Sequence, residues 1–176
     1  MIYLCEREIG FDPAEIGFPS VMGCRALVLV TGGGLFGYHL NGSLNAAKRT
    51  AFVNFVAGHP RGSSQKMGLY AASTGGGLAA DHAELAEIAV ALAHAGPVYW
   101  ASLSSAGSMY VNVIDVGHAT CGITARPWND AVDGAAAHKA AYMPSPDRTM
   151  ANGAATAQMV VHVDPAGLAA VYPVKI

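Results

Sequence analysis

Short apolar runs separated by glycine-containing turns dominate this chain. One run covers residues 25–30 and a second covers 35–41, with the Thr31–Gly34 turn between them. Two such runs flanking a glycine-containing turn are typical of a β-hairpin. Later runs of similar length predict further strands; they occupy residues 66–73, 98–103, 109–116, 120–125, 158–163 and 170–174.

Two segments instead repeat their apolar residues at helical spacing. The first follows Ser43, a residue suited to an N-cap, and is ended by Gly58 and Pro60. The second is expected to begin at Asp81, with Glu84 in the capping-box position, and to end before residues 96–97. The sequence therefore predicts two helices among the strands.

Two segments of the sequence predict their structure less clearly. Residues 1–23 predict a short strand followed by loops, and residues 126–157 predict a long loop with one short helix. Taken together, the elements predict one α+β domain over residues 1–176. We expect a mostly antiparallel, sandwich-like sheet with about two helices.

Composition limits the class of protein. Charged residues make up only 12% of the chain, against about 25% in an average domain. No apolar stretch is long enough to span a membrane, and the N-terminus lacks the basic and apolar regions of a signal peptide. We expect a protein made in the cytoplasm with no membrane partner, and delivery into a target cell without a cleaved signal stays open. The alanine-rich, weakly charged surface hints at self-association into a homo-oligomer.

Cysteines and charges refine this expectation. The three cysteines, Cys5, Cys24 and Cys121, do not suit a disulfide framework. No Asp or Glu occurs between residues 16 and 80, although five cations do: Arg25, Lys48, Arg49, Arg61 and Lys66. These cations either create a positive field that favours a thiolate or an acidic partner, or they form an ordinary solvated face. They are too scattered to indicate a nucleic-acid partner.

Cys24 and His39 form the most specific chemical pattern in the chain. If the turn is centred on residues 32–33, paired positions sum to 65, so that Cys24 faces Asn41 and Ala26 faces His39. Cys24 and His39 are then diagonal neighbours on one face of the hairpin, and a thiol beside an imidazole can form a nucleophile with its base. The alternative is that Cys24 is a small buried hydrophobe and His39 a structural histidine.

Three neighbours are candidates for substrate binding. Gly23 permits a close approach, so that the amide of Cys24 could help to bind an oxyanion. Asn41 shares the face of Cys24 and could position a substrate amide, or it is a turn residue that bonds locally. Tyr38 directly precedes the histidine and is the third candidate.

The hairpin resembles a known catalytic motif. Met-Gly-Cys at residues 22–24 and Tyr-His-Leu-Asn-Gly at residues 38–42 are similar to the catalytic hairpin of the cytotoxic-necrotizing-factor class of glutamine deamidases. Chemotaxis-receptor deamidases are more distant relatives of that class. The resemblance covers residues 22–42. The group that orients the histidine in that family, often a backbone carbonyl, is not identifiable from this sequence.

The resemblance implies a function. Cys24 would attack the side-chain carboxamide of a glutamine on a target protein, with His39 as base and acid, and water would hydrolyse the thioester. An amine in place of water would give transglutamination. Such a protein would act as an effector or toxin and would need no metal and no cofactor.

Two alternative functions remain open. Gly32, Gly34 and Gly37 follow an apolar run in a G-x-G-x-x-G pattern, which resembles the start of a nicotinamide-binding Rossmann domain. Against it, the next acid after the motif is Asp81. A non-catalytic interaction domain is the second alternative. Asp115, His118 and Cys121 recur every three residues, but without a fourth ligand they do not predict a metal site.

Overall fold

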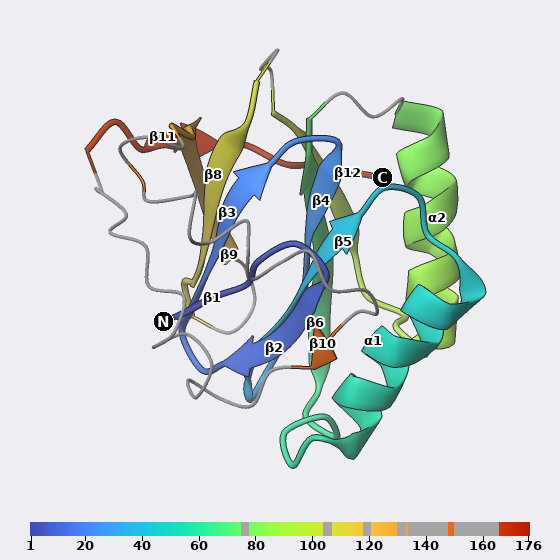
Figure 1. The fold of residues 1–176 in the computed structure, drawn as a ribbon. Coiled ribbons are helices and arrows are strands. Elements are labelled where there is room, and N and C mark those ends of the chain that lie inside the picture. Colours follow the sequence, from blue (N-terminus) through green and yellow to red (C-terminus); the bar gives the residue numbers. More distant parts are fainter. Residues whose placement is uncertain (75–77, 104–106, 118–120, 130–132, 134–147, 150–165) are drawn as a thin grey trace.

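The protein has an α+β fold of three layers. A computed structural model describes residues 1–74, 78–103, 107–117, 121–129, 133, 148–149 and 166–176. In this part of the chain, two open, mixed and mostly antiparallel sheets lie face to face, and two helices cover the outer face of one of them (Figure 1). The predicted fold class is confirmed.

The first layer is a five-stranded sheet with the order β1-β3-β8-β9-β11. All its pairs are antiparallel except β1 with β3. The strands span Ile2–Tyr3 (β1), Glu15–Val21 (β3), Met109–Asp115 (β8), Cys121–Pro127 (β9) and Ala169–Val171 (β11).

The second layer is a seven-stranded sheet with the order β10-β2-β5-β4-β6-β7-β12. The pairs β10 with β2 and β6 with β7 are parallel, and the others are antiparallel. Its strands span Glu8–Asp12 (β2), Cys24–Thr31 (β4), Gly34–Asn41 (β5), Lys66–Ser73 (β6), Val98–Ser102 (β7), Arg148–Thr149 (β10) and Val174–Lys175 (β12).

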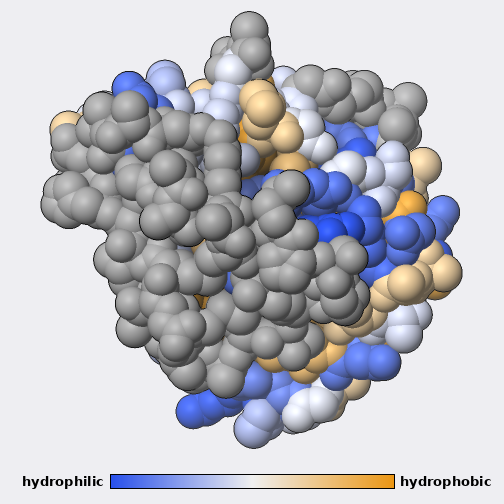
Figure 2. Space-filling view, viewed as in Figure 1, coloured by the Kyte–Doolittle hydropathy of each residue, from blue (hydrophilic) through white to orange (hydrophobic). Residues whose placement is uncertain are grey.

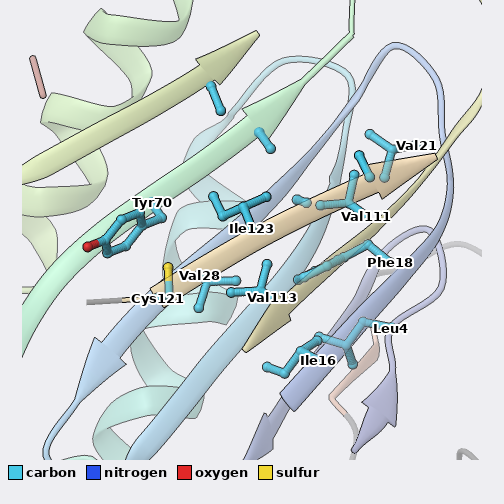
Figure 3. Close-up of a cluster of buried hydrophobic side chains, with 14 of the residues drawn as sticks. Leu4, Ile16, Phe18, Val21, Val28, Tyr70, Val111, Val113, Cys121 and Ile123 are labelled. Atoms are coloured by element: carbon cyan, nitrogen blue, oxygen red, sulfur yellow. The ribbon is translucent and has the colours of Figure 1, made fainter. Parts of the chain in front are cut away.

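Two buried clusters separate the layers. Alternate residues of β4 point to opposite faces, so Val28 belongs to the cluster between the sheets and Leu29 to the cluster beneath the helices. Figure 3 shows side chains of both sheets in the first cluster, including Val28, Tyr70 and Ile123. Strand β4 is therefore buried on both faces, which explains its nearly unbroken apolar sequence.

The helices form the third layer. Helix α1 spans Ala46–Gly58 and helix α2 spans Leu78–Ala91. Phe52 of α1 and Leu85 of α2 are buried against the seven-stranded sheet. The described surface on this side mixes hydrophilic and hydrophobic residues (Figure 2, viewed as Figure 1).

Both predicted helix starts were wrong. Helix α1 is capped by Asn45, whose side chain accepts a hydrogen bond from the amide of Lys48 at 2.9 Å, and not by Ser43. Helix α2 begins before Asp81, which lies inside the helix with its side chain fully buried. The carboxylate of Asp81 therefore serves a long-range network and not a cap, and the expected capping box with Glu84 does not form.

The N-terminal region holds more strands than the sequence indicated. Residues 1–23 form three strands, β1, β2 and β3, in place of the predicted single strand and loops. Pro19 is accommodated because the β3–β8 register shifts between Phe18 and Val21, and Ser20 takes a positive φ of 57° there. A bulge leaves room for a proline without a lost ladder hydrogen bond.

The C-terminal predictions are only partly tested. The predicted strand over residues 170–174 is two short strands, β11 and β12, which belong to different sheets. Within the predicted loop over residues 126–157, the pair Arg148–Thr149 forms the short strand β10. The predicted strand over residues 158–163 lies outside the described residues.

Candidate functional site

The hairpin of β4 and β5 brings Cys24 and His39 to one face of the seven-stranded sheet. The observed register pairs Cys24 with Asn41 and Ala26 with His39, as predicted. Cys24 and Ala26 belong to the cluster between the two sheets, so His39 faces the same layer. Diagonal neighbours of this kind have Cα atoms about 7–8 Å apart, which is within reach of a thiol and an imidazole.

The imidazole of His39 is held in one orientation by the N-terminal strand region. Its side chain is fully buried, and its Nδ1 lies 2.9 Å from the carbonyl oxygen of Leu4. The ring of Phe18 meets it edge-on, with ring centroids 6.0 Å apart. The amide of Arg7 also donates to the backbone carbonyl of His39 at 2.9 Å, so the turn after β1 is fastened to β5 at this residue.

This contact decides the tautomer of His39. A carbonyl oxygen can only accept, so Nδ1 of His39 must carry the proton and donate to Leu4. In a neutral imidazole, Nε2 is then a bare acceptor, and it is buried without a hydrogen-bond partner among the described residues. A general base needs such an unprotonated nitrogen with its other nitrogen held by a fixed acceptor.

Burial also sets the charge of His39. Removal from water lowers the pKa of His39 from 6.5 to about 4, and the hydrogen bond to the carbonyl of Leu4 opposes this change only in part. Desolvation disfavours the charged imidazolium, which explains the direction. His39 is therefore neutral at pH 7 in the folded protein.

Cys24 is buried too, at the first position of β4. Its residue is 4% exposed, and burial and the charge of Glu6 raise the pKa of its thiol. Hydrogen bonds from the backbone of Met22 and Gly42, together with the charge of Lys48, lower that pKa in part. The thiol is consequently protonated at pH 7, and the positive field, one of the two interpretations of the cations in the sequence, does not prevail at Cys24.

Ion pairs with acids of helix α2 explain why the positive field at Cys24 is weak. Arg25, the cation next to Cys24 in sequence, forms ion pairs with Asp81 at 2.5 Å and with Glu84 at 3.0 Å. Arg49 pairs with Glu87 at 2.8 Å. Acids of helix α2, outside the acid-free segment of the sequence, thus neutralise cations inside it.

The three candidate binding residues have different placements. The amide of Gly23, with a positive φ of 65°, donates to the hydroxyl of Thr74 at 3.1 Å. Asn41 lies directly opposite Cys24 and is half-buried. Tyr38 points to the other face of the sheet, where its ring stacks on Phe52 with centroids 5.7 Å apart. The structure brings Gly23 and Asn41 to Cys24 but does not bring Tyr38.

One functional group was missed by sequence reasoning. The carbonyl of Leu4 orients His39, and it lies 35 residues away along the chain. A backbone carbonyl leaves no signature in the identity of its residue, so no pattern in the sequence could have indicated it. The carbonyl of Leu4 reaches His39 because the residues after β1 pack against β5.

The glycine pattern does not have the geometry of a nucleotide-binding turn. Gly34 and Gly37 lie in strand β5, which pairs antiparallel with β4, so the segment is strand–turn–strand. A dinucleotide pyrophosphate requires a helix N-terminus after the first glycines. Gly37 instead allows close packing, because a Cβ there would lie 2.7 Å from Cδ1 of Leu4.

The described residues show neither a metal site nor a membrane-spanning helix. Among the described residues, no group of three or more His, Cys, Asp or Glu side chains could hold a metal ion. Asp115 and Cys121 face each other across β8 and β9, whereas His118 lies outside the described residues. None of the described helices is long and apolar enough to cross a membrane.

In comparisons with known proteins, no family model matches this chain and no curated protein matches it significantly. The geometry of the hairpin therefore carries the functional argument without support from relatives.

Proposed function

We propose that this protein is a cysteine-dependent amidohydrolase that deamidates a glutamine side chain on a target protein. The single observation that carries the proposal is the state of His39, which lies on the same face of the hairpin as Cys24: its Nδ1 donates to the carbonyl of Leu4, and its Nε2 has no hydrogen-bond partner among the described residues, Cys24 included. A structural histidine would normally have both nitrogens satisfied when fully buried. This Nε2, which has no partner among the described residues, is where a general base would receive the thiol proton.

The reaction proceeds through a thioester. Sγ of Cys24 bonds to the carboxamide carbon while its proton passes to Nε2 of His39. The tetrahedral intermediate then collapses as His39 returns the proton to the leaving nitrogen, the C–N bond breaks and ammonia departs. Water, deprotonated by His39, attacks the thioester, and the thiol leaves with that proton to give a glutamate side chain.

The Leu4 carbonyl has a clear part in this sequence. When His39 gains a proton at Nε2, the ring becomes positive, and the carbonyl that accepts from Nδ1 then stabilises the charged form. The same contact holds the ring in one orientation. Leu4 thus acts as the orienting group that the resemblance requires but the sequence does not reveal.

A mechanism-based label tests the proposal without knowledge of the target. In a peptide that carries a diazoketone analogue of glutamine, the thiol gives its proton to the diazo carbon and its sulfur then displaces N₂ there to form a stable thioether, and the labelled cysteine is located by mass spectrometry. We expect Cys24 to be labelled, and labelling to fall by about 10²- to 10⁴-fold in His39→Gln, the range for loss of a general base.

Cys121 is the internal control for this experiment. It is 8% exposed, and burial raises the pKa of its thiol to about 12. We expect it to stay unlabelled in both proteins. Equal labelling of Cys24 and Cys121, or full labelling of Cys24 in His39→Gln, would refute the proposed pair and favour a non-catalytic binding domain.

A further inference from the structure

Lys48 occupies an unusual place for a lysine. It lies in the first turn of helix α1, where the helix dipole favours acids, and that turn contains no acidic residue. Its side chain turns back along the chain, so that Nζ donates to the carbonyl oxygens of Asn41 and Ser43. The side chain of Lys48 thus binds the backbone of the loop between β5 and α1.

The peptide group between Asn41 and Gly42 connects Lys48 to Cys24. Its carbonyl oxygen accepts from Lys48, and its N–H belongs to Gly42, whose backbone hydrogen-bonds to the thiol of Cys24. In a planar trans peptide, the C=O and N–H point in opposite directions. Because Asn41 pairs directly with Cys24, this peptide lies between the cation and the sulfur.

Gly42 is suited to this geometry by its backbone conformation. Its φ is +56°, a region that side chains rarely adopt, although a Cβ there would meet nothing within 4 Å. The glycine is therefore required by the turn of the chain and not by lack of space. At this turn the backbone of Gly42 hydrogen-bonds to the thiol of Cys24 at the start of β4.

Arg25 holds the next peptide in a different way. Its NH1 donates to the carbonyl of Gly42 at 2.6 Å, but its charge is matched by Asp81 and Glu84. Lys48 forms no ion pair among those the structure describes, and its charge lowers the pKa of Cys24. Arg25 therefore fixes the loop, whereas Lys48 also supplies a positive charge that no ion pair of the described residues neutralises.

We propose that Lys48 is a positioning residue that acts through the Asn41–Gly42 peptide and makes the Gly42 amide a stronger donor to negative charge at the sulfur of Cys24. A cation on the carbonyl polarises the peptide and strengthens its N–H as a donor. Among the described residues, the charged groups that act on Cys24 are Lys48 and the opposing carboxylate of Glu6, and the neutral His39 lies on the same face of the hairpin. The use of this arrangement in catalysis rests on the proposed function, but its effect on the thiol does not.

The experiment measures the rate of Cys24 alkylation by iodoacetamide against pH, resolved by mass spectrometry. In Lys48→Met we expect the rate at pH 8 to fall by about three- to tenfold and the midpoint to move to higher pH. Lys48→Gln keeps a donor without the charge and should also lose reactivity, whereas Lys48→Arg should restore most of it. A general loosening of the fold would instead raise alkylation of Cys121.

Arg49→Met is the matched control. Arg49 is the next residue of the same helix, and the substitution removes the same charge, but its partner is Glu87. We expect its alkylation profile to match the wild type. Identical profiles for Lys48→Met and Arg49→Met would overturn the inference.

The two proposals fail in distinguishable ways. If the glutamine analogue does not label Cys24 but Lys48→Met still shifts the alkylation profile, the amidohydrolase is refuted and the role of Lys48 stands. If the analogue labels Cys24 in a His39-dependent way and the Lys48 variants alkylate like the wild type, the amidohydrolase stands and the role of Lys48 is refuted.

Discussion

The burial of His39 makes the stability of this protein depend on pH in a predictable window. In the unfolded chain the imidazole has a pKa of about 6.5, whereas in the folded protein its pKa is about 4. Between these values the unfolded state binds a proton at His39 that the folded state does not. The contribution of His39 to the free energy of unfolding is therefore fully present above pH 6.5 and is lost progressively as the pH falls to 4.

The magnitude follows from the two pKa values. Each pKa unit corresponds to about 1.4 kcal/mol, so the difference at His39 amounts to about 3 kcal/mol of unfolding free energy. That is a large fraction of the roughly 5–15 kcal/mol that stabilises a typical domain. Below pH 4 both states are protonated at His39, and its contribution to the pH dependence ends.

Urea denaturation at a series of pH values from 8 to 4 measures this effect. Other groups titrate in the same range, so the quantity of interest is the difference between the wild type and His39→Gln, which cannot titrate there. We expect the wild type to lose about 3 kcal/mol more than the variant over this range. His59→Gln is the control, because burial and the charge of Arg61 also lower the pKa of His59, but His59 is only half-buried whereas His39 is fully buried.

One result would refute the reasoning. If His39→Gln shows the same pH dependence as the wild type, then His39 is protonated as readily in the folded state as in the unfolded chain. The imidazole would then be accessible to water or paired with an acid, and the argument for a buried, neutral base would be wrong.

Two further substitutions test the surroundings of the site. Gly37→Ala places a Cβ 2.7 Å from Cδ1 of Leu4, and we expect it to destabilise the protein in urea by about 1–3 kcal/mol and to weaken analogue labelling of Cys24. Asp81→Asn leaves Arg25 without its nearest charge partner, which should cost about 3 kcal/mol at pH 7. Burial raises the pKa of the Asp81 carboxyl, but hydrogen bonds from its partners outweigh this and lower it below its usual value. The cost should therefore shrink as the pH falls through that lowered pKa, and a constant cost down to pH 2 would contradict this argument.

The hairpin was predictable because its determinants are local. The two-residue turn centred on residues 32–33 fixes the register, and a slip of one position would move the side chains of one strand to the opposite buried layer. The placement of Cys24 opposite Asn41 follows from these two constraints alone. Tyr38 does not share a face with Cys24, because a residue adjacent to His39 in a strand points to the opposite face.

Other elements could not be predicted because their determinants are distant in sequence. Asp81 suits an N-cap by residue type, and only its partners, the hydroxyl of Ser73 at 2.8 Å and the indole of Trp100 at 3.0 Å, show that it is a buried acid. Strand β3 contains Pro19, which argues locally against a strand. Its pairing with β8, about 90 residues later, supplies the bulge that accommodates the proline.

The directions of the pKa shifts of Cys24 and His39 indicate how charge develops on this pair during the proposed reaction. Burial raises the pKa of Cys24 and lowers that of His39, so thiol and imidazole are both neutral before reaction. In the proposed reaction, the proton therefore moves while the C–S bond forms, and charge of both signs appears only near the transition state. The Leu4 carbonyl lies at the end of the imidazole that becomes positive, and the Gly42 amide lies at the sulfur from which negative charge passes to the substrate. Groups fixed in advance at both ends stabilise that charge separation more than the neutral ground state, which is the condition for a contact to lower a barrier.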